Sequence, residues 1–276
     1  MDELAASAIL LPIRAVISDF DGTLARGHVA LPGLAAFYAL LVQRRIAFTV
    51  VTNNTTRTPA QYAARLAGFG VALAPEQVLT ASVATAAYLK EHFDAGAPLF
   101  VIGESGLRTE LETAGFRLVD GAAGPVAAVV VGGDRGLTYA ALKTAVRHIL
   151  RGAVFIGTNP DLLVPDEDEL VPEAGVNLAA IQAATGAAPL IIGKPERPLL
   201  DLAMARMGGT PADTAIMGDR AETDIAGGQR LGLTTILLTT GVDDAASSAA
   251  KGFVADLVAP GLDTLAAWWR VGERAV

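Results

Sequence analysis

Two carboxylates stand directly after the first predicted strand of the chain. Asp19 and Asp21 follow a buried apolar run and are themselves followed by Gly22 and Thr23. Two acids at this spacing, with a glycine that lets backbone groups come close, suit a hard divalent cation. An ordinary Asp-Gly turn that caps a helix explains the same residues equally well, because a motif this short often occurs by chance.

A second pair of carboxylates follows a later predicted strand. Asp219 lies at the tip of that strand, and Asp224 lies within the first turns of the next predicted helix. One of these acids could simply cap the helix and interact with its macrodipole. Ligands of an open α/β sheet bind beyond the carboxyl ends of its strands. Both acid pairs are therefore expected at one edge of the sheet, which favours a hard-metal site there.

Uncharged polar residues and one lysine follow two more predicted strands. Thr52, Asn53 and Asn54 lie at the end of the second strand, where hydroxyl and amide groups can hydrogen-bond phosphate oxygens. The same residues could form the N-cap of the next helix. Lys194 lies at another strand end and could neutralise a phosphate and a nearby carboxylate, although most lysines are plain surface residues. The segment around Lys194 lacks the glycine spacing and the Ser or Thr of a P-loop.

Short β-branched runs alternate with helical patterns along the whole chain. Nearly continuous apolar strands between helices indicate a parallel sheet that is covered on both faces, and hence an α/β fold. The sheet is the element that must position the acids, amides and lysine, because all of them follow its strands. The predicted strands are 14–18, 47–52, 99–102, 127–131, 154–156, 190–192, 214–217 and 235–238, and the predicted helices are 32–45, 57–69, 80–93, 105–114, 139–150, 175–184, 198–207, 222–231 and 262–270.

The composition limits the chemistry and the partners. The chain has 276 residues, with 29 acidic and 21 basic side chains, a net charge of −8 and no cysteine. Disulfides, thiolate catalysis and zinc–thiolate sites are therefore excluded. The acidic balance argues against nucleic acid polymers as partners, and no apolar stretch is long enough to span a membrane. Because the acidic N-terminus is unlike a secretory leader, we expect a soluble, cytoplasmic protein.

Taken together, the four strand ends resemble the motifs of the haloacid dehalogenase (HAD) superfamily. That family has an Asp-x-Asp-Gly-Thr motif, a Thr or Ser, a Lys and a Gly-Asp motif with a second Asp downstream, in this order. Here these are residues 19–23, Thr52, Lys194 and residues 218–224. Residues 158–161 and 193–195 add a similarity to the NagD-type, p-nitrophenyl phosphatase-like subfamily. Residues 172–175 depart from its more glycine-rich turn, and we associate this region with substrate specificity.

The resemblance implies a Rossmann-like, doubly wound parallel sheet core with an inserted α/β cap domain of the C2 type. About half of the chain lies between Thr52 and Lys194, which is long enough for such an insertion. We therefore predict a catalytic core of residues 1–80 and 187–276 and a cap of residues 81–186. Whether two copies form a homodimer through the cap is a question that the sequence leaves open.

The resemblance also implies roles for the motif residues. Asp19 would attack the phosphorus atom and form an aspartyl-phosphate. Mg²⁺ would be held by Asp19, the backbone carbonyl of Asp21 and Asp219, with waters and a phosphate oxygen as the other ligands. Asp224 would orient the Asp219 side of the metal site and its waters. Asp21 would act as general acid on the leaving alkoxide and then as general base on water. The residues assigned to phosphate binding are Thr52, Asn53, Asn54 and Lys194.

These roles predict a Mg²⁺-dependent phosphatase that hydrolyses small phosphomonoesters, such as sugar phosphates, glycerol phosphate, nucleotides or p-nitrophenyl phosphate. The partner would be a small phosphorylated metabolite, not a nucleic acid polymer or a membrane. Asp21 and the later acid pair favour a phosphatase over a dehalogenase, which needs no metal. Two alternatives stay open. One is a phosphotransferase or phosphomutase, and the other is a catalytically silent protein that binds phosphometabolites on the same scaffold.

Some polar and aromatic residues have simpler explanations. The three histidines are scattered along the chain, and we expect them at the surface or in packing. Trp268 and Trp269 lie in the last predicted helix, where packing or an interface explains them. Asn159 and Asp161 could face the site, but an Asn-Pro-Asp turn explains them equally well. The acidic run 166–169 is expected to be a solvated loop.

Overall fold

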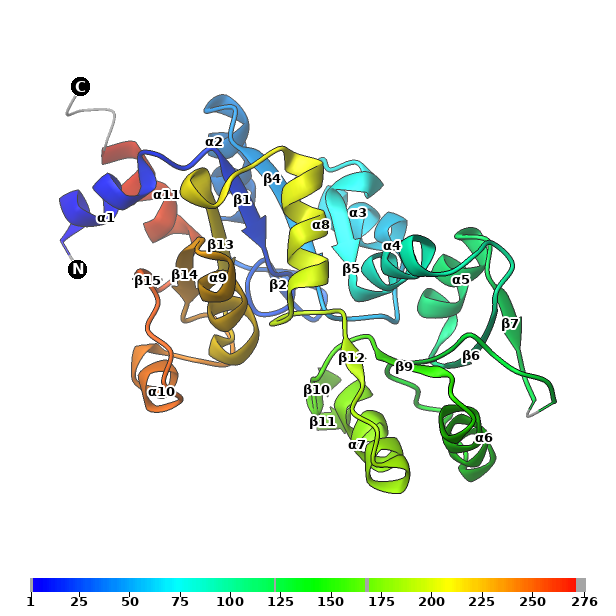
Figure 1. Ribbon diagram of the computed structural model, residues 1–276. Helices are drawn as coiled ribbons and strands as arrows, with labels where there is room; N and C mark the ends of the chain where they lie inside the picture. Colours follow the sequence, from blue (N-terminus) through cyan, green and yellow to red (C-terminus); the bar gives the residue numbers. More distant parts are fainter. Residues whose placement is uncertain (1, 122, 167–168, 272–276) are drawn as a thin grey trace. The chain divides into compact units, whose positions relative to one another are not determined.

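The protein consists of two compact units, seen in a computed structural model that describes residues 2–121, 123–166 and 169–271 (Figure 1). The core unit comprises Met1–Thr52, Ala60–Val78 and Leu200–Val276, and the cap unit comprises Asn53–Pro59 and Leu79–Leu199. The domain limits predicted from the sequence instead give residues 53–59, 79–80 and 187–199 to the core. We describe each unit by itself.

A six-stranded sheet forms the centre of the core unit. Its order is β15-β14-β13-β1-β4-β5, and β1 pairs in parallel with both β13 and β4. The chain starts in the middle of the sheet at β1, extends to β4 and β5, and then returns to β13, β14 and β15 on the other side. This is the predicted doubly wound arrangement. The strands are β1 (Ala15–Ser18), β4 (Ala47–Thr52), β5 (Val78–Thr80), β13 (Thr214–Gly218), β14 (Thr234–Leu238) and β15 (Leu257–Ala259).

The apolar character of these strands explains their place inside the core unit. All four residues of β1 and all five of β13 are buried, as expected for parallel strands that are covered on both faces. The helices α1 (Glu3–Leu10), α2 (Leu34–Gln43) and α11 (Leu262–Val271) pack together (Figure 1). Trp269 of α11 is buried, and its ring centroid lies 5.7 Å from that of Phe37 in α2. Trp268 is buried as well, so the prediction that both tryptophans serve packing is confirmed.

Shorter elements complete the core unit. A two-stranded antiparallel hairpin, β2 (Ala25–Arg26) and β3 (Val29–Ala30), follows β1. None of the helices in the described part of the chain is long and apolar enough to cross a membrane. The remaining helices outside the cap are α3 (Pro59–Gly68), α8 (Arg197–Met207), α9 (Ala226–Leu231) and α10 (Ala245–Ala250).

A second parallel sheet, of five strands, forms the centre of the cap unit. Its order is β12-β9-β8-β6-β7, and β8 is buried throughout. Side chains of α6 and α7 join the strands in one apolar cluster. The strands are β6 (Pro98–Ile102), β7 (Arg117–Val119), β8 (Ala128–Val131), β9 (Val154–Gly157) and β12 (Leu190–Ile191), and the helices are α4 (Ala81–His92), α5 (Ser105–Thr113), α6 (Tyr139–Leu150) and α7 (Ala174–Thr185).

The predicted acidic loop lies at an antiparallel hairpin of the cap unit. Strands β10 (Leu163–Asp166) and β11 (Glu169–Pro172) pair with each other, and Asp166 lies opposite Glu169. The ends of the acidic run are therefore strand residues, whereas residues 167–168 lie outside the described residues. Each of these two strands contains a proline, which argues against a strand when only the sequence is considered.

Close packing of α9 against the core sheet makes a testable stability prediction. A Cβ added at Gly228 would overlap the side chain of Ile216 and come within 2.7 Å of Thr235 Cγ2. We expect Gly228→Ala to lower the free energy of unfolding by about 1–3 kcal/mol, because overpacking a close contact strains the neighbouring side chains. Urea unfolding of the purified variant measures this loss.

The control for this prediction is a glycine in a helix with open space around it. A Cβ at Gly68, the last residue of α3, meets nothing within 4 Å. Gly68→Ala should therefore be neutral or stabilise by up to about 1 kcal/mol, through helix propensity alone. Equal unfolding midpoints for the two variants would contradict the close contact between α9 and the sheet.

Candidate functional site

Three of the predicted site carboxylates come together in the core unit. Asp19, Asp219 and Asp224 each offer an oxygen atom, and these atoms all lie within 4.8 Å of one another. Opposite ligands of Mg²⁺, each about 2.1 Å from the ion, are about 4 Å apart, so small side-chain movements would bring the group to ligand distances. Asp219 and Asp224 are buried, which makes their mutual repulsion strong. The donor set therefore fits a hard divalent cation.

The register of the core sheet explains why acids far apart in the sequence meet. Ser18, the last residue of β1, lies opposite Met217 of β13. Asp19 therefore leaves its strand level with Gly218, and its backbone N–H donates a hydrogen bond to Met217 O at 2.9 Å. Asp219 directly follows Gly218, the last residue of the neighbouring strand β13. The two acids thus stand side by side at the point where the strand order reverses, the place where ligands bind in sheets of this type.

The loop after β14 fixes Asp219 against the first acid motif. The backbone N–H of Val242 donates to Asp219 Oδ2 at 2.8 Å, and that of Asp243 donates to Asp219 O at 2.9 Å. Thr240 Oγ1 donates to Gly22 O at 2.6 Å. One loop therefore holds both the metal-side carboxylate and the turn that follows Asp19.

Asp243 anchors this loop, and sequence reasoning missed it. Its carboxylate accepts hydrogen bonds from the Ala221 backbone at 2.9 Å and from Ser247 Oγ at 2.8 Å, and Lys251 Nζ lies 3.0 Å away. Burial alone would raise the pKa of Asp243, but these hydrogen bonds outweigh it and hold that pKa below its ordinary value. A signal was present, since residues 239–244 follow a predicted strand and contain a glycine and two acids.

Glycines leave the room that the carboxylates need. Gly22 has a left-handed backbone, with φ of +81°, and a Cβ there would overlap the Asp219 carboxylate. A Cβ at Gly241 would overlap the same carboxylate, and one at Gly218 would overlap Asp224. The helix predicted at 222–231 begins with a π-helical turn, Ala221–Ile225, which carries Asp224. Such turns often mark functional sites.

Two other predicted residues lie in the core unit. Asp21 is exposed, and its side chain does not belong to the group of three carboxylates found among the described residues. This agrees with the sequence-based prediction that Asp21 binds the metal through its backbone carbonyl and not through its carboxylate. Thr52 is the last residue of β4 and is buried. Because β4 pairs with β1, Thr52 ends at the same edge of the sheet as Asp19.

In the cap unit, Asn53 connects several predicted residues. Its Oδ1 accepts a hydrogen bond from the backbone N–H of Lys194 at 2.8 Å, and its Nδ2 donates to Lys194 O at 2.9 Å and to Asp161 Oδ2 at 3.0 Å. Asn159 Nδ2 donates to Asn53 O at 2.9 Å. The Asn53 side chain is therefore committed to structure, and its backbone N–H is the group that could bind phosphate.

The turn predicted for residues 158–161 is confirmed. The backbone N–H of Asp161 donates to Asn159 Oδ1 at 3.0 Å, which is the predicted turn. The same two side chains contact Asn53, so they also support the predicted site. Gly193 is required beside Lys194, because a Cβ there would lie 2.6 Å from both Asn53 Oδ1 and Thr158 O. Lys194 itself is only 2% exposed, so it is not a plain surface lysine.

Asn54 has a turn-forming role. Its Oδ1 accepts hydrogen bonds from the backbone N–H and from Oγ1 of Thr56, both at 2.8 Å. This contact supports the capping and turn interpretation of the segment after β4.

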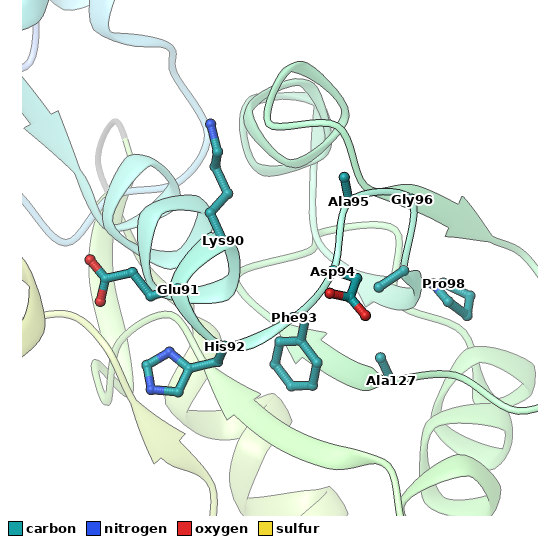
Figure 2. A pocket seen from close by; sticks show the side chains of 10 residues that line it. Lys90, Glu91, His92, Phe93, Asp94, Ala95, Gly96, Pro98 and Ala127 are labelled. Atoms are coloured by element: carbon teal, nitrogen blue, oxygen red, sulfur yellow. The ribbon is translucent and has the colours of Figure 1, made fainter.

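A groove elsewhere in the cap unit contains none of the predicted site residues. It is lined by residues 90–98 and Ala127, at the end of α4 and the start of β6. Figure 2 shows the ring of Phe93 and the carboxylate of Asp94 among its side chains. One of the three histidines, His92, lies here at the surface, and its Nδ1 is 2.8 Å from Tyr88 O.

Comparisons with known proteins agree with the motifs. A family model described as haloacid dehalogenase-like hydrolase matches residues 16–117, and a HAD-hydrolase-like model matches residues 191–265. Dihydroxyacetone phosphatase of Corynebacterium glutamicum is 40% identical over 228 residues, which are 83% of this chain and 82% of that protein. The structure of NagD from E. coli K-12 is similar, with a TM-score of 0.82, 31% identity and coverage of 91% of this chain and 97% of that chain.

A third similar protein has been solved with a metal ion. It is a glycerol phosphate phosphatase from Mycobacterium tuberculosis in complex with magnesium. The TM-score is 0.84 with 30% identity, and the match covers 93% of this chain and 77% of that chain.

The crowding of Gly241 against Asp219 predicts a variant that weakens cation binding. Gly241→Ala would displace the Asp219 carboxylate, and we expect the affinity for Mg²⁺, measured by isothermal titration calorimetry, to fall at least about tenfold. Gly261→Ala is the matched control, because the nearest atom to its Cβ is Thr240 Cγ2 at 3.9 Å. Unchanged affinity in a folded Gly241→Ala variant would show that Asp219 is not a ligand.

Proposed function

The chain belongs to the haloacid dehalogenase-like hydrolases and is a phosphatase of small phosphomonoesters, and we propose that it acts through the carboxylates at the edge of its core sheet. The observation that carries this proposal is the group of Asp19, Asp219 and Asp224, whose oxygens lie within 4.8 Å of one another. These are residues of the first and last acid motifs, and they meet where a doubly wound sheet binds its ligands.

Asp19 is the nucleophile in this proposal. Its carboxylate attacks phosphorus in line with the leaving oxygen and forms an aspartyl-phosphate, a covalent route that carboxylates can follow. Asp21 donates a proton to the leaving alkoxide. It then takes a proton from the water that hydrolyses the acyl phosphate and returns Asp19 to its free form. The exposure of Asp21 suits a group that exchanges protons with the leaving group and with water.

The residues proposed to hold Mg²⁺ are the three grouped carboxylates and the backbone carbonyl of Asp21. When bound, the cation offsets the repulsion between an anionic nucleophile and an anionic phosphate, and it stabilises charge in the transition state. The magnesium complex of the similar glycerol phosphate phosphatase supports the choice of ion. In this chain the hydrogen bonds from residues 242 and 243 hold Asp219 ready for that role.

We assign the phosphate oxygens to Thr52, the backbone N–H of Asn53 and the Lys194 ammonium. Asn53 follows Thr52 directly in the chain, and its side chain binds both backbone polar groups of Lys194. Those hydrogen bonds set where the lysine main chain lies relative to Asn53. Asn54 stays a prediction as a phosphate ligand, since its side-chain oxygen already accepts two hydrogen bonds.

The substrate is a small phosphorylated metabolite, and a short hydroxylated carbon chain is the class that we favour. The similar proteins are named dihydroxyacetone phosphatase, acid sugar phosphatase and glycerol phosphate phosphatase. A cytoplasmic location, a homodimer through the cap and the absence of nucleic acid partners stay predictions from the sequence.

The role of Asp19 predicts that its replacement abolishes turnover. We expect Asp19→Asn to lower kcat for p-nitrophenyl phosphate at least about a thousandfold, because an amide cannot form the phosphoenzyme. Excess chelator should do the same to the wild-type enzyme. Asp120→Asn, at a fully exposed cap position, is the control and should keep full activity. Equal release of p-nitrophenol and inorganic phosphate distinguishes hydrolysis from transfer to another acceptor.

The proton transfers assigned to Asp21 predict a dependence on the leaving group. Asp21→Asn should slow hydrolysis of glycerol phosphate by about 10²–10⁴-fold, because an alkoxide leaves poorly without a proton. p-Nitrophenolate is a much weaker base, so its release should be affected less. Stopped-flow absorbance should then show a burst of p-nitrophenolate as the phosphoenzyme accumulates. Equal slowing of both esters without a burst would count against Asp21 as the acid and base.

A further inference from the structure

The cap unit contains a buried carboxyl group that the proposed chemistry does not use. Glu173 directly precedes α7 and is only 8% exposed. Its side chain makes no capping hydrogen bond to the helix. No group within the described ranges of the chain is a hydrogen-bond partner of its Oε1, which is shielded from solvent. A buried polar atom without a partner is costly, and this cost points to a ligand that satisfies it.

The backbone around Glu173 fixes the position of its carboxyl group. The Glu173 N–H donates to Leu162 O at 3.0 Å, and the Gly175 N–H donates to Asp161 O at 2.9 Å. The carboxyl group rests against Gly133, where an added Cβ would overlap both of its oxygens. The start of α7 is therefore tied to the 160–162 turn, and a glycine leaves space for the acid.

Glu173 belongs to the same cluster as the proposed phosphate-binding residues of the cap unit. Asp161, whose charge acts on Glu173, accepts a hydrogen bond from Asn53 at 3.0 Å. Asn53 in turn binds the backbone of Lys194 at 2.8 and 2.9 Å. Glu173 therefore lies in the same part of the cap unit as the residues to which we assign the phosphate, Asn53 and Lys194.

The surroundings of Glu173 favour its neutral form. Burial raises the pKa of Glu173 to about 7, and the charges of Asp161 and Glu104 act in the same direction. The nearby polar groups of the Ala174 backbone and the Asn159 side chain lower the pKa of Glu173, but they do not cancel this shift. The group is therefore protonated below about pH 7, where it can both donate and accept a hydrogen bond.

The other charged groups near Glu173 are already compensated. Glu104 lies 3.6 Å from Arg135 in an ion pair. Asp134 accepts hydrogen bonds from the backbone of Gly103 and Gly136. A neutral carboxyl group beside compensated charges suits a hydroxyl group, which also donates and accepts, better than it suits a cation.

We propose that Glu173 determines specificity by hydrogen-bonding, through Oε1, a hydroxyl group on the carbon chain of the phosphate ester. The preferred substrates are then short polyhydroxylated alkyl phosphates. This assignment rests on the proposed phosphatase function and adds a substrate-selecting residue to it. It also agrees with the expectation from the sequence that residues 172–175 affect substrate specificity.

The test compares kcat/KM for two esters that differ in their hydroxyl groups, glycerol 3-phosphate and n-propyl phosphate. At pH 6.5 the wild-type enzyme should prefer glycerol phosphate at least about tenfold, and Glu173→Ala should reduce this ratio to about two or less. Glu173→Gln, which resembles the protonated acid, should keep the preference. Glu112→Gln, at an exposed position of α5, is the matched control and should leave the ratio unchanged.

The pH profile of the same ratio gives a second readout. In the wild-type enzyme the preference should fall as the pH rises through about 7, because ionised Glu173 loses the O–H that donates to the substrate hydroxyl group. In Glu173→Gln it should stay constant. The ratio of two substrates cancels the titration of the groups that act on both.

Several results would overturn the proposal. Equal losses on both esters in Glu173→Ala would indicate a structural role, and an unchanged ratio would remove Glu173 from the substrate site. A preference for phosphoethanolamine over glycerol phosphate would identify an ammonium as the bound group instead. If the wild-type enzyme fails to hydrolyse p-nitrophenyl phosphate, the proposed function itself is wrong. Activity on that ester combined with an unchanged ratio contradicts only the role of Glu173.

Discussion

The parallel pairing of β1 with β13 is the constraint on which the candidate active site depends. It sets Ser18 opposite Met217, so that Asp19 and Asp219 leave neighbouring strands at nearly the same level. Because the chain starts at β1 and later returns to its other side, acids from the two ends of the sequence share one sheet edge. A slip of one residue would turn the alternating side chains to opposite faces and separate the carboxylates.

Grouping three carboxylates is unfavourable without compensation, and the surrounding loops show how the core unit tolerates it. Backbone N–H groups of residues 242 and 243 hydrogen-bond Asp219, and Asp243 ties that loop to the π-helical turn that carries Asp224. Glycines at 22, 218 and 241 keep Cβ atoms out of the space that the acids occupy. The anionic cluster is thus preorganised for a cation, which is how electrostatic catalysis avoids reorganisation during the reaction.

In the cap unit, the neutral side chain of Asn53 holds distant segments of the chain together. The Asn53 amide binds Lys194 and Asp161 and so links the segment after β4 to two distant parts of the chain. The Asn53 side chain connects these segments and does not bind phosphate in our assignment, because its amide groups already make hydrogen bonds within the protein. The same cluster extends to Glu173, the buried acid whose carboxyl group lies against Gly133.

The sequence by itself determined the α/β class, the doubly wound sheet and the identity of the clustered acids. Apolar runs and the order of motifs can be read directly along the chain. The strand predicted at 47–52 and the helix predicted at 139–150 match β4 and α6 to the residue. Only the tertiary structure revealed the short hairpins, the anchoring of a loop by Asp243 and the buried position of Glu173. Asp243 contacts Ala221 and Glu173 contacts Gly133, and in both pairs the two residues lie far apart in the sequence. A carboxylate looks the same in the sequence whether it is solvated or buried, and folding alone decides which it is.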